Sequence, residues 1–229
     1  MRCFFCIELD APTREQLAQV IQRLRSAPAQ VRWVEPDLLH VTLKFLGEVD
    51  AGQIPALQTI VRQVVAPCAP FALTLDRVGA FPHLDRARVI WAGAGYTPAP
   101  LASMAAAFEE ALCEVGFAKE QKPFTAHVTL GRVREEQASS LRALGERLRA
   151  AALAPMAVKV EGITLMQSVL RPQGPTYTPV FTVGFDRRNS ADQKPIRLKT
   201  VGGNGPQRGV DLDNTAELLD QIEPEAGPR

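Results

Sequence analysis

Several residue types are scarce in this sequence of 229 residues, and their scarcity excludes several classes of protein. No stretch approaches the ~18 consecutive apolar residues that a membrane-spanning helix needs. The apolar run at residues 3–7 is too short for the core of a signal peptide. The four cysteines are too few for a disulfide scaffold in a chain of this length and fit a reducing compartment. We therefore expect a cytoplasmic protein that does not associate with membranes.

Net charge is almost absent, because 26 basic residues and 25 acidic residues give a formal charge of +1. Non-specific binding along a nucleic acid depends on many Lys and Arg residues that neutralise phosphates. The balance therefore argues against a large nucleic-acid cradle and leaves room for a small, local phosphate site. The content of 46% hydrophobic and 22% charged residues is ordinary for a globular protein and excludes a fully disordered chain.

Cys3 and Cys6 form a C-x-x-C spacing, which in other proteins binds zinc or carries redox chemistry. The segment is expected to be a strand, where a spacing of three places the two thiols on opposite faces. No second cysteine pair completes a zinc set. We therefore favour a structural role for both cysteines.

The composition changes after Phe185. Residues 187–229 contain no Phe, Trp or Tyr, while Gly and Pro are frequent, and such a segment cannot bury enough apolar surface to offset its ordering entropy. We predict one domain over residues 1–186 and a disordered tail over residues 187–229. Basic residues precede acidic ones in this tail, so two roles remain open: a solvated extension, or a basic strip that helps to hold RNA.

Within residues 1–186, strand-like and helix-like patterns of apolar residues follow one another. They predict strands at residues 3–9, 39–46, 71–75, 88–92, 125–132, 158–165 and 180–185, and helices around residues 17–24, 54–64, 101–115 and 135–150. The strand at 88–92 is expected to pair with the strand at 71–75, after a loop that contains Gly79 and Pro82. Because such hairpin-like pairs lack an intervening helix, we predict an α+β fold with largely antiparallel sheets.

The tetrapeptide His-Val-Thr-Leu occurs twice, at residues 40–43 and 127–130, and uses two of the three histidines. Each copy lies in a predicted strand and is followed by a helical pattern, which indicates one supersecondary unit used twice. Successive side chains of a strand point to opposite faces. His40 and Thr42 therefore share one face of the first copy, and His127 and Thr129 share one face of the second.

An imidazole beside a hydroxyl suits phosphate chemistry. A hydroxyl donates hydrogen bonds to phosphoryl oxygens, and an imidazole titrates near neutrality, so it can give or take a proton. Two copies that face a common cleft supply one acid, one base and two anchoring hydroxyls. The alternative, two half-buried strand histidines without a shared role, is weakened by the identity of the two tetrapeptides.

A zinc site is a further interpretation, because imidazole is a common zinc ligand. Catalytic zinc sites usually hold three protein ligands, and no His-Glu-x-x-His pattern or carboxylate at fixed spacing accompanies these histidines. Glu48 and Asp50 suit the start of the following helix better, where acidic side chains interact favourably with the helix dipole. We therefore predict a site without a metal ion or another cofactor.

With these motifs the sequence resembles the two-histidine phosphoesterases, and most closely the RNA 2′,3′-cyclic phosphodiesterases, also called 2′-5′ RNA ligases. The resemblance covers nearly all of residues 1–186. Besides the two H-x-T motifs, it rests on residues 2–9, 33–34, 39–49, 78–82, 88–93, 124–132, 168–170 and Tyr177. One departure is Ala126, where this family often has a proline before the second histidine. The tail has no counterpart in the family pattern.

The resemblance implies two pseudo-symmetric α+β lobes, related by an internal duplication, with the H-x-T strands facing each other across a central groove. It also implies hydrolysis of an RNA 2′,3′-cyclic phosphate end to a 2′-phosphate by acid-base catalysis without a metal ion. In the family's assignment His40 is the proton donor and His127 the proton acceptor. Thr42 and Thr129 hold the non-bridging oxygens.

Other residues are further candidates in this scheme. Arg132 is a candidate charge clamp for the phosphate, although strict alternation from Leu130 turns it to the core side. Tyr177 and Phe81 are candidates for stacking on a base, with ordinary packing as the alternative for both. His83 is expected at the surface. The expected partners are RNA ends or cyclic nucleotides, and the protein is expected to be a monomer.

Two other functions remain open. The same site acting in reverse would join RNA halves through a 2′-5′ linkage, and the residues do not separate the two directions because one transition state serves both. A non-catalytic module that binds nucleotides or RNA is disfavoured because both histidines are present.

Overall fold

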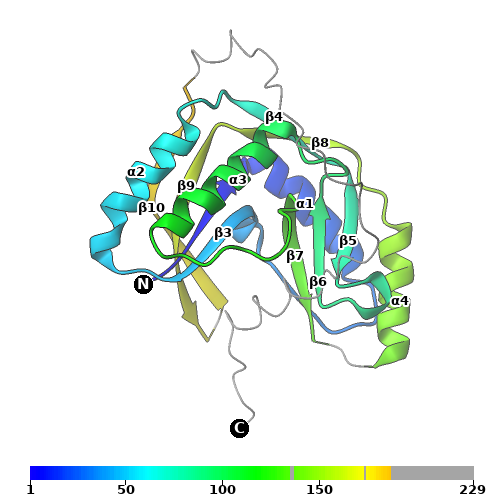
Figure 1. Cartoon of the computed structure of the whole chain (residues 1–229). Coiled ribbons are helices and arrows are strands. Elements are labelled where there is room, and N and C mark those ends of the chain that lie inside the picture. The colour runs from blue at the N-terminus through cyan, green and yellow to red at the C-terminus, as the bar shows by residue number, and fades with distance from the viewer. Residues whose placement is uncertain (135–136, 173, 187–229) are drawn as a thin grey trace.

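The computed structural model describes residues 1–134, 137–172 and 174–186, so the predicted tail over residues 187–229 lies outside the described residues. Strands and helices alternate along the chain (Figure 1). The strands are β1 (Arg2–Glu8), β2 (Val31–Trp33), β3 (His40–Glu48), β4 (Phe71–Leu75), β5 (Arg77–Phe81), β6 (Val89–Gly93), β7 (His127–Val133), β8 (Met156–Val160), β9 (Gly162–Arg171) and β10 (Gly174–Gly184). The helices are α1 (Ala11–Leu24), α2 (Ile54–Val65), α3 (Ala99–Glu114) and α4 (Ala138–Ala150).

Most strands belong to one sheet. Its strand order is β10-β9-β1-β3-β7-β6-β5, and β2 pairs with β7 as well, which makes eight strands among the described residues. A second sheet consists of β4 and β8. The pairings within both sheets are antiparallel. The prediction of an α+β fold with antiparallel sheets is confirmed.

The large sheet has two halves that meet at the two H-x-T strands. β3 and β7 pair only at Val41 and Val128, and both valines are completely buried. β10, β9 and β1 extend the sheet on the β3 side, while β6 and β5 extend it on the β7 side (Figure 1). The predicted two-lobed arrangement is thus confirmed, and the duplicated strands are direct neighbours at its centre.

The helices cover the sheet with apolar faces. In α1, Asp10 caps the N-terminus by accepting from the Thr13 N–H at 2.9 Å, and the residues buried at helical spacing include Leu17, Val20, Ile21 and Leu24. α2 and α3 lie on the β10 side of the molecule, and α4 lies beside β5 (Figure 1). In the described residues, no helix combines the length and apolar character required to cross a membrane.

The predicted pairing of residues 88–92 with residues 71–75 is wrong. β6 pairs with β5 and β7, whereas β4 pairs with β8. The predicted loop around Gly79 is the strand β5. Gly79 pairs with Trp91 of β6, whose indole lies over it, and a Cβ on residue 79 would overlap that ring. A glycine in a strand often marks such a close approach rather than a loop.

Four smaller details differ from the predictions. The predicted strand at 158–165 is two strands, β8 and β9, separated by Glu161, and β10 begins several residues before residue 180. The short strand β2 was not predicted. Asp50 caps a 3-10 turn as expected, but Glu48 ends β3 instead of starting a helix.

Candidate active site

The two H-x-T motifs meet on one face of the central sheet. An antiparallel pair centred on Val41 and Val128 places His40 toward Thr129 and His127 toward Thr42. Because the valines point into the core, the histidines and threonines point to the other face. All four side chains line one pocket of about 480 Å³. The structure therefore brings together the residues that the repeat singled out.

Both motifs end in a β-bulge at the same position. Phe5 pairs with Lys44 and Cys6 with Thr42, which leaves Leu43 as the extra residue of β3. Likewise, Ile90 pairs with Gly131 and Trp91 with Thr129, which leaves Leu130 as the extra residue of β7. An extra residue shifts the alternation of the strand by one position. Both strands therefore exchange faces after the Leu of the repeated tetrapeptide.

The bulge at Leu130 decides where Arg132 points. Strict alternation turns Arg132 away from the motif face, but the structure places it in the pocket with His127 and Thr129. The equivalent bulge in β3 brings Phe45 into the pocket. It turns Lys44 into the interior, where its ammonium group donates to Glu109 at 3.0 Å and to the Ala118 carbonyl at 2.7 Å.

His40 is held by its backbone and by two aromatic rings. Its Nδ1 lies 2.7 Å from the Leu38 carbonyl oxygen, and because a carbonyl only accepts, Nδ1 carries the hydrogen. In the neutral ring Nε2 then accepts, and the Thr42 hydroxyl donates to it at 3.1 Å. Phe4 stacks on the imidazole at 4.8 Å between ring centroids, and Tyr177 meets it edge-on at 5.4 Å.

His127 has an equivalent backbone tether and different neighbours. Its Nδ1 donates to the Thr125 carbonyl at 2.8 Å, so Nε2 is again the nitrogen available to a substrate. Phe81 and Trp91 contact the ring edge-on, with centroid distances of 5.1 and 6.5 Å. Phe81 is only 5% exposed, so it supports His127 and has no face for a base.

The pocket keeps both imidazoles neutral in the free protein. Burial lowers the pKa of His40 to about 4, with smaller contributions from the nearby charges of His127, Arg14 and Arg132, while the hydrogen bond to Leu38 opposes the shift. Burial also lowers the pKa of His127, and the charge of Arg132 acts in the same direction. An anion bound between the rings acts oppositely, because it favours the charged imidazolium.

Tyr177 reaches the pocket from β10, where it pairs with Ser168 of β9. Its ring meets Phe4 edge-on at 5.0 Å as well as His40. The structure therefore gives Tyr177 a packing contact with the imidazole. Its predicted role in stacking on a base stays a prediction.

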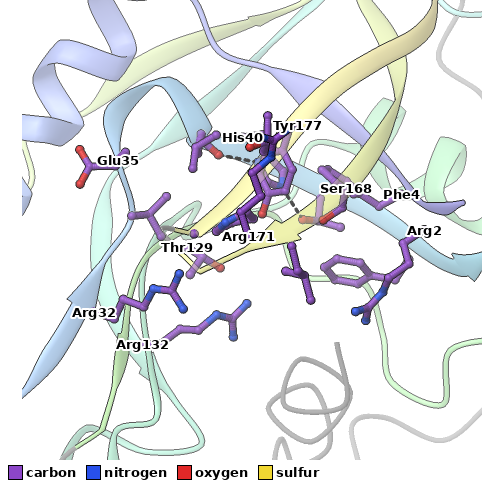
Figure 2. Close-up of a pocket in the computed structure, with 18 of the residues that line it drawn as sticks. Arg2, Phe4, Arg32, Glu35, His40, Thr129, Arg132, Ser168, Arg171 and Tyr177 are labelled. Atoms are coloured by element: carbon purple, nitrogen blue, oxygen red, sulfur yellow. Dashed lines mark hydrogen bonds between the residues drawn. The ribbon is translucent and has the colours of Figure 1, made fainter. Parts of the chain in front are cut away.

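Sequence reasoning missed three arginines of the pocket. Arg2 comes from the start of β1, Arg32 from β2 and Arg171 from the end of β9. Figure 2 shows Arg32 beside Arg132 below Thr129, with Arg2 on the far side of the pocket. These residues lie outside any repeated motif, so only the tertiary arrangement reveals them. Glu35 is the one carboxylate among the described lining residues.

The other candidates of the sequence analysis lie away from this pocket or in its wall. His83 is an exposed residue in the loop after β5, as expected. Cys3 and Cys6 are buried in β1 with free thiols, and Cys3 contributes to the wall. In the part of the chain that the structure describes, no three His, Cys, Asp or Glu residues gather into a group suited to a metal ion.

Two antiparallel H-x-T strands at the junction of a duplicated α+β fold define the class of two-histidine phosphoesterases. The family model described as LigT like Phosphoesterase matches residues 7–91 and 96–177. The chain belongs to this LigT-like phosphoesterase family, and the predicted resemblance and enzyme class are confirmed.

The chain is also similar to curated proteins and solved structures over most of its length. A curated RNA 2′,3′-cyclic phosphodiesterase of Methanothermobacter thermautotrophicus is 31% identical over 179 residues, which is 78% of this chain and 95% of the relative. One from Aeropyrum pernix is 33% identical over 73% of this chain and 94% of its own length. Escherichia coli LigT complexed with 3′-AMP superposes with a TM-score of 0.65 at 30% identity, covering 80% of this chain and 97% of that one.

Proposed function

We propose that this protein is an RNA 2′,3′-cyclic phosphodiesterase, which hydrolyses the cyclic phosphate at an RNA 3′ end and leaves a 2′-phosphate. The observation that carries the proposal is the meeting of two tethered imidazoles and two threonines on one face of the central sheet. The names of the relatives and the 3′-AMP complex of E. coli LigT support the substrate.

The reaction needs one base and one acid. A water molecule loses a proton as its oxygen attacks phosphorus, the bond from phosphorus to the 3′-oxygen breaks, and the leaving 3′-oxygen gains a proton. We assign His127 as the proton acceptor and His40 as the proton donor, each acting through Nε2, because both Nδ1 atoms are held by backbone carbonyls. Each positioned proton transfer typically contributes about 10²- to 10⁴-fold in rate.

The hydroxyls and Arg132 are assigned to the phosphate. In the free protein the Thr42 hydroxyl donates to His40 at 3.1 Å, so this donor is already oriented beside the imidazole. With substrate bound, Thr42 and Thr129 donate to the non-bridging oxygens, which gain negative charge in the transition state. Arg132 lies on the same face through the Leu130 bulge and supplies a positive charge to the same group.

Substrate binding also prepares the acid. With a pKa of about 4, His40 is neutral at pH 7 in the free protein. A cyclic phosphate carries one negative charge, and its arrival between the two imidazoles favours uptake of the single proton that the reaction requires. The site then holds one proton shared by a coupled pair.

Product analysis tests this function. A short RNA that ends in a 2′,3′-cyclic phosphate is incubated with the full chain, with and without EDTA, and the end group is identified chromatographically. We expect the 2′-phosphate in both cases, since the proposed mechanism assigns every proton transfer to a side chain. A 3′-phosphate product, joining of RNA halves without hydrolysis, or activity that EDTA abolishes and zinc or manganese restores would contradict the proposal.

A further inference from the structure

The pocket carries more positive charge than one cyclic phosphate requires. Among the described residues that line it are four arginines, Arg2, Arg32, Arg132 and Arg171, and one carboxylate, that of Glu35. The whole chain, in contrast, has a formal charge of only +1. The proposed reaction involves one singly charged phosphate, to which the two threonines and Arg132 are already assigned. The remaining arginines of the pocket therefore offer positive charge to a second anionic group of the substrate.

Arg32 is the best placed of these remaining residues. It lies directly across from Arg132 in the β2–β7 pair, so both side chains are on the same face of the sheet. Because of the bulge at Leu130, Thr129 and Arg132 pair with β6 residues only two positions apart, Trp91 and Val89, which is about 7 Å of strand. Arg32 lies on the neighbouring strand β2, at the same level as Arg132 (Figure 2). It therefore lies beyond the phosphate position defined by the two H-x-T motifs.

The guanidinium of Arg32 also meets the opposite wall of the pocket. Its Nη2 lies 3.2 Å from the position that a Cβ of Gly174 would occupy, and Gly174 begins β10 with a φ of +135°. A glycine is favoured at this φ, and the missing side chain leaves room for the guanidinium. Arg32 thus spans from β2 to the β9–β10 turn at one end of the pocket.

The two ends of the pocket differ although the repeat makes them equivalent. Phe45 and Arg132 hold corresponding positions after the bulges at Leu43 and Leu130. One end therefore presents the rings of Phe4 and Phe45 with Arg2 near them, and the other presents Arg132 with Arg32 beside it (Figure 2). The end of an RNA chain is asymmetric in a similar way. Its terminal base has apolar faces, and the next phosphate in the 5′ direction is anionic.

We infer that Arg32 binds the phosphodiester that joins the terminal nucleotide to the rest of the RNA. This inference rests on the proposed function, because the position of the reacting phosphate orients the RNA. A guanidinium recognises a phosphate by paired, charge-assisted hydrogen bonds. The site then distinguishes an RNA end from a free cyclic mononucleotide, since a mononucleotide lacks this second phosphate.

The test compares two substrates on the full chain. Adenosine 2′,3′-cyclic phosphate and the dinucleotide ApA that ends in a 2′,3′-cyclic phosphate present the same reacting group, and only the dinucleotide has the second phosphate. The ratio of their kcat/KM values is measured for the wild type, for Arg32→Ala and for Arg32→Lys. Because the ratio is taken on one protein sample, partial unfolding of a variant cancels. Arg25→Ala, which removes an exposed arginine after α1 and outside the pocket, is the matched control.

We expect the wild type and Arg25→Ala to prefer the dinucleotide about tenfold and Arg32→Ala to lose that preference, since a single phosphate contact is worth about one tenfold step. Arg32→Lys should keep part of it, because the charge remains without the paired geometry. KM for the dinucleotide should also depend less steeply on salt concentration in Arg32→Ala than in the wild type, because one screened charge contact is removed.

Three outcomes would overturn the inference: no preference in the wild type, an unchanged preference in Arg32→Ala with unchanged kcat/KM on both substrates, or an unchanged preference with an equal loss of kcat/KM on both substrates. The last result would assign Arg32 to the reacting phosphate. Failure of the wild type to hydrolyse either substrate would overturn the proposed function itself, so the two failures are distinguishable.

Discussion

His40 and His127 belong to identical motifs, yet their side chains meet different groups. Phe4 and Tyr177 contact His40, whereas Phe81 and Trp91 contact His127. In both, Nδ1 donates to the carbonyl of the residue two positions earlier, at Leu38 and at Thr125. The repeat therefore fixes the orientation of the rings through the backbone, and the surrounding strands supply the packing.

Replacing either histidine should remove most of the activity. We expect His40→Ala and His127→Ala each to lower kcat by about 10²- to 10⁴-fold, the usual contribution of a positioned acid or base. Each variant should remain folded, because neither imidazole belongs to the buried apolar core. Steady-state kinetics on a cyclic nucleotide and thermal melts check both points, with the exposed His83→Ala as the control. Near wild-type turnover in either motif variant contradicts the two-histidine mechanism.

The pH profile should reflect the lowered pKa values of both histidines. The plot of kcat/KM reports the free enzyme, in which activity rises as the base loses its proton and falls as the acid loses its proton. Because burial lowers the pKa of both groups, we expect this bell to lie on the acidic side of pH 6.5. A bound phosphate anion raises both pKa values, so the bell for kcat should lie at higher pH. Coinciding bells centred above pH 7 would contradict this electrostatic account.

The threonines should act mainly in the transition state. Thr42→Val and Thr129→Val keep the branched shape that suits a strand and remove the hydroxyl. If the hydroxyls stabilise charge that develops on the phosphate, the double variant loses kcat more than it raises KM. If the threonines only suit the strands, both constants stay unchanged. Kinetics on a 2′,3′-cyclic nucleotide distinguish these results.

At the scale of elements, the β-bulges decide which residues reach the pocket. Leu43 and Leu130 each interrupt the alternation of a strand that otherwise obeys it. Simple alternation predicted the faces of the histidines and threonines because they precede the bulge. It failed for Arg132 and Lys44, which follow the bulge. A bulge depends on how the neighbouring strand pairs, and periodicity within one strand carries no information about that.

The close packing of the Trp91 indole of β6 on Gly79 of β5, behind His127, gives a second test at this scale. A Cβ on Gly79 would overlap the Trp91 indole, and Trp91 contacts His127. We expect Gly79→Ala to destabilise the protein by about 1–3 kcal/mol, as overpacking commonly does, and to lower kcat as the indole shifts. Gly52→Ala is the matched control, because nothing lies within 4 Å of its Cβ position. Equal melting temperatures for the two variants would show that the indole moves freely.

At the scale of the whole molecule, the pocket belongs to the junction between the two halves of the sheet. β1, β3, β9 and β10 provide one wall and β2 and β7 the other, and the halves pair through Val41 and Val128. Each half therefore supplies one H-x-T motif, and neither half alone holds both imidazoles. Duplication explains why a single-chain phosphoesterase has two equivalent motifs in one site.

Deletion of residues 190–229 should leave this junction intact. The described core closes with Phe185, which packs on Phe71 at 6.1 Å between ring centroids, and residues 187–229 contain no aromatic side chain to add to it. We expect the melting temperature and the turnover of a cyclic mononucleotide to stay within error of the full chain. A large fall in either quantity would show that these residues take part in folding or in the site.

The sequence by itself determined the fold class, the duplication and the four motif residues. It did so because strand alternation and an exact repeat are local properties: Val41 and Val128 point to the core, so His40, Thr42, His127 and Thr129 share the other face. Tertiary structure alone decided the strand order, the pairing of β5 with β6 and the arginines of the pocket. Arg32 reaches Gly174 across 142 residues of chain, and such contacts depend on packing between distant segments, which no local pattern encodes.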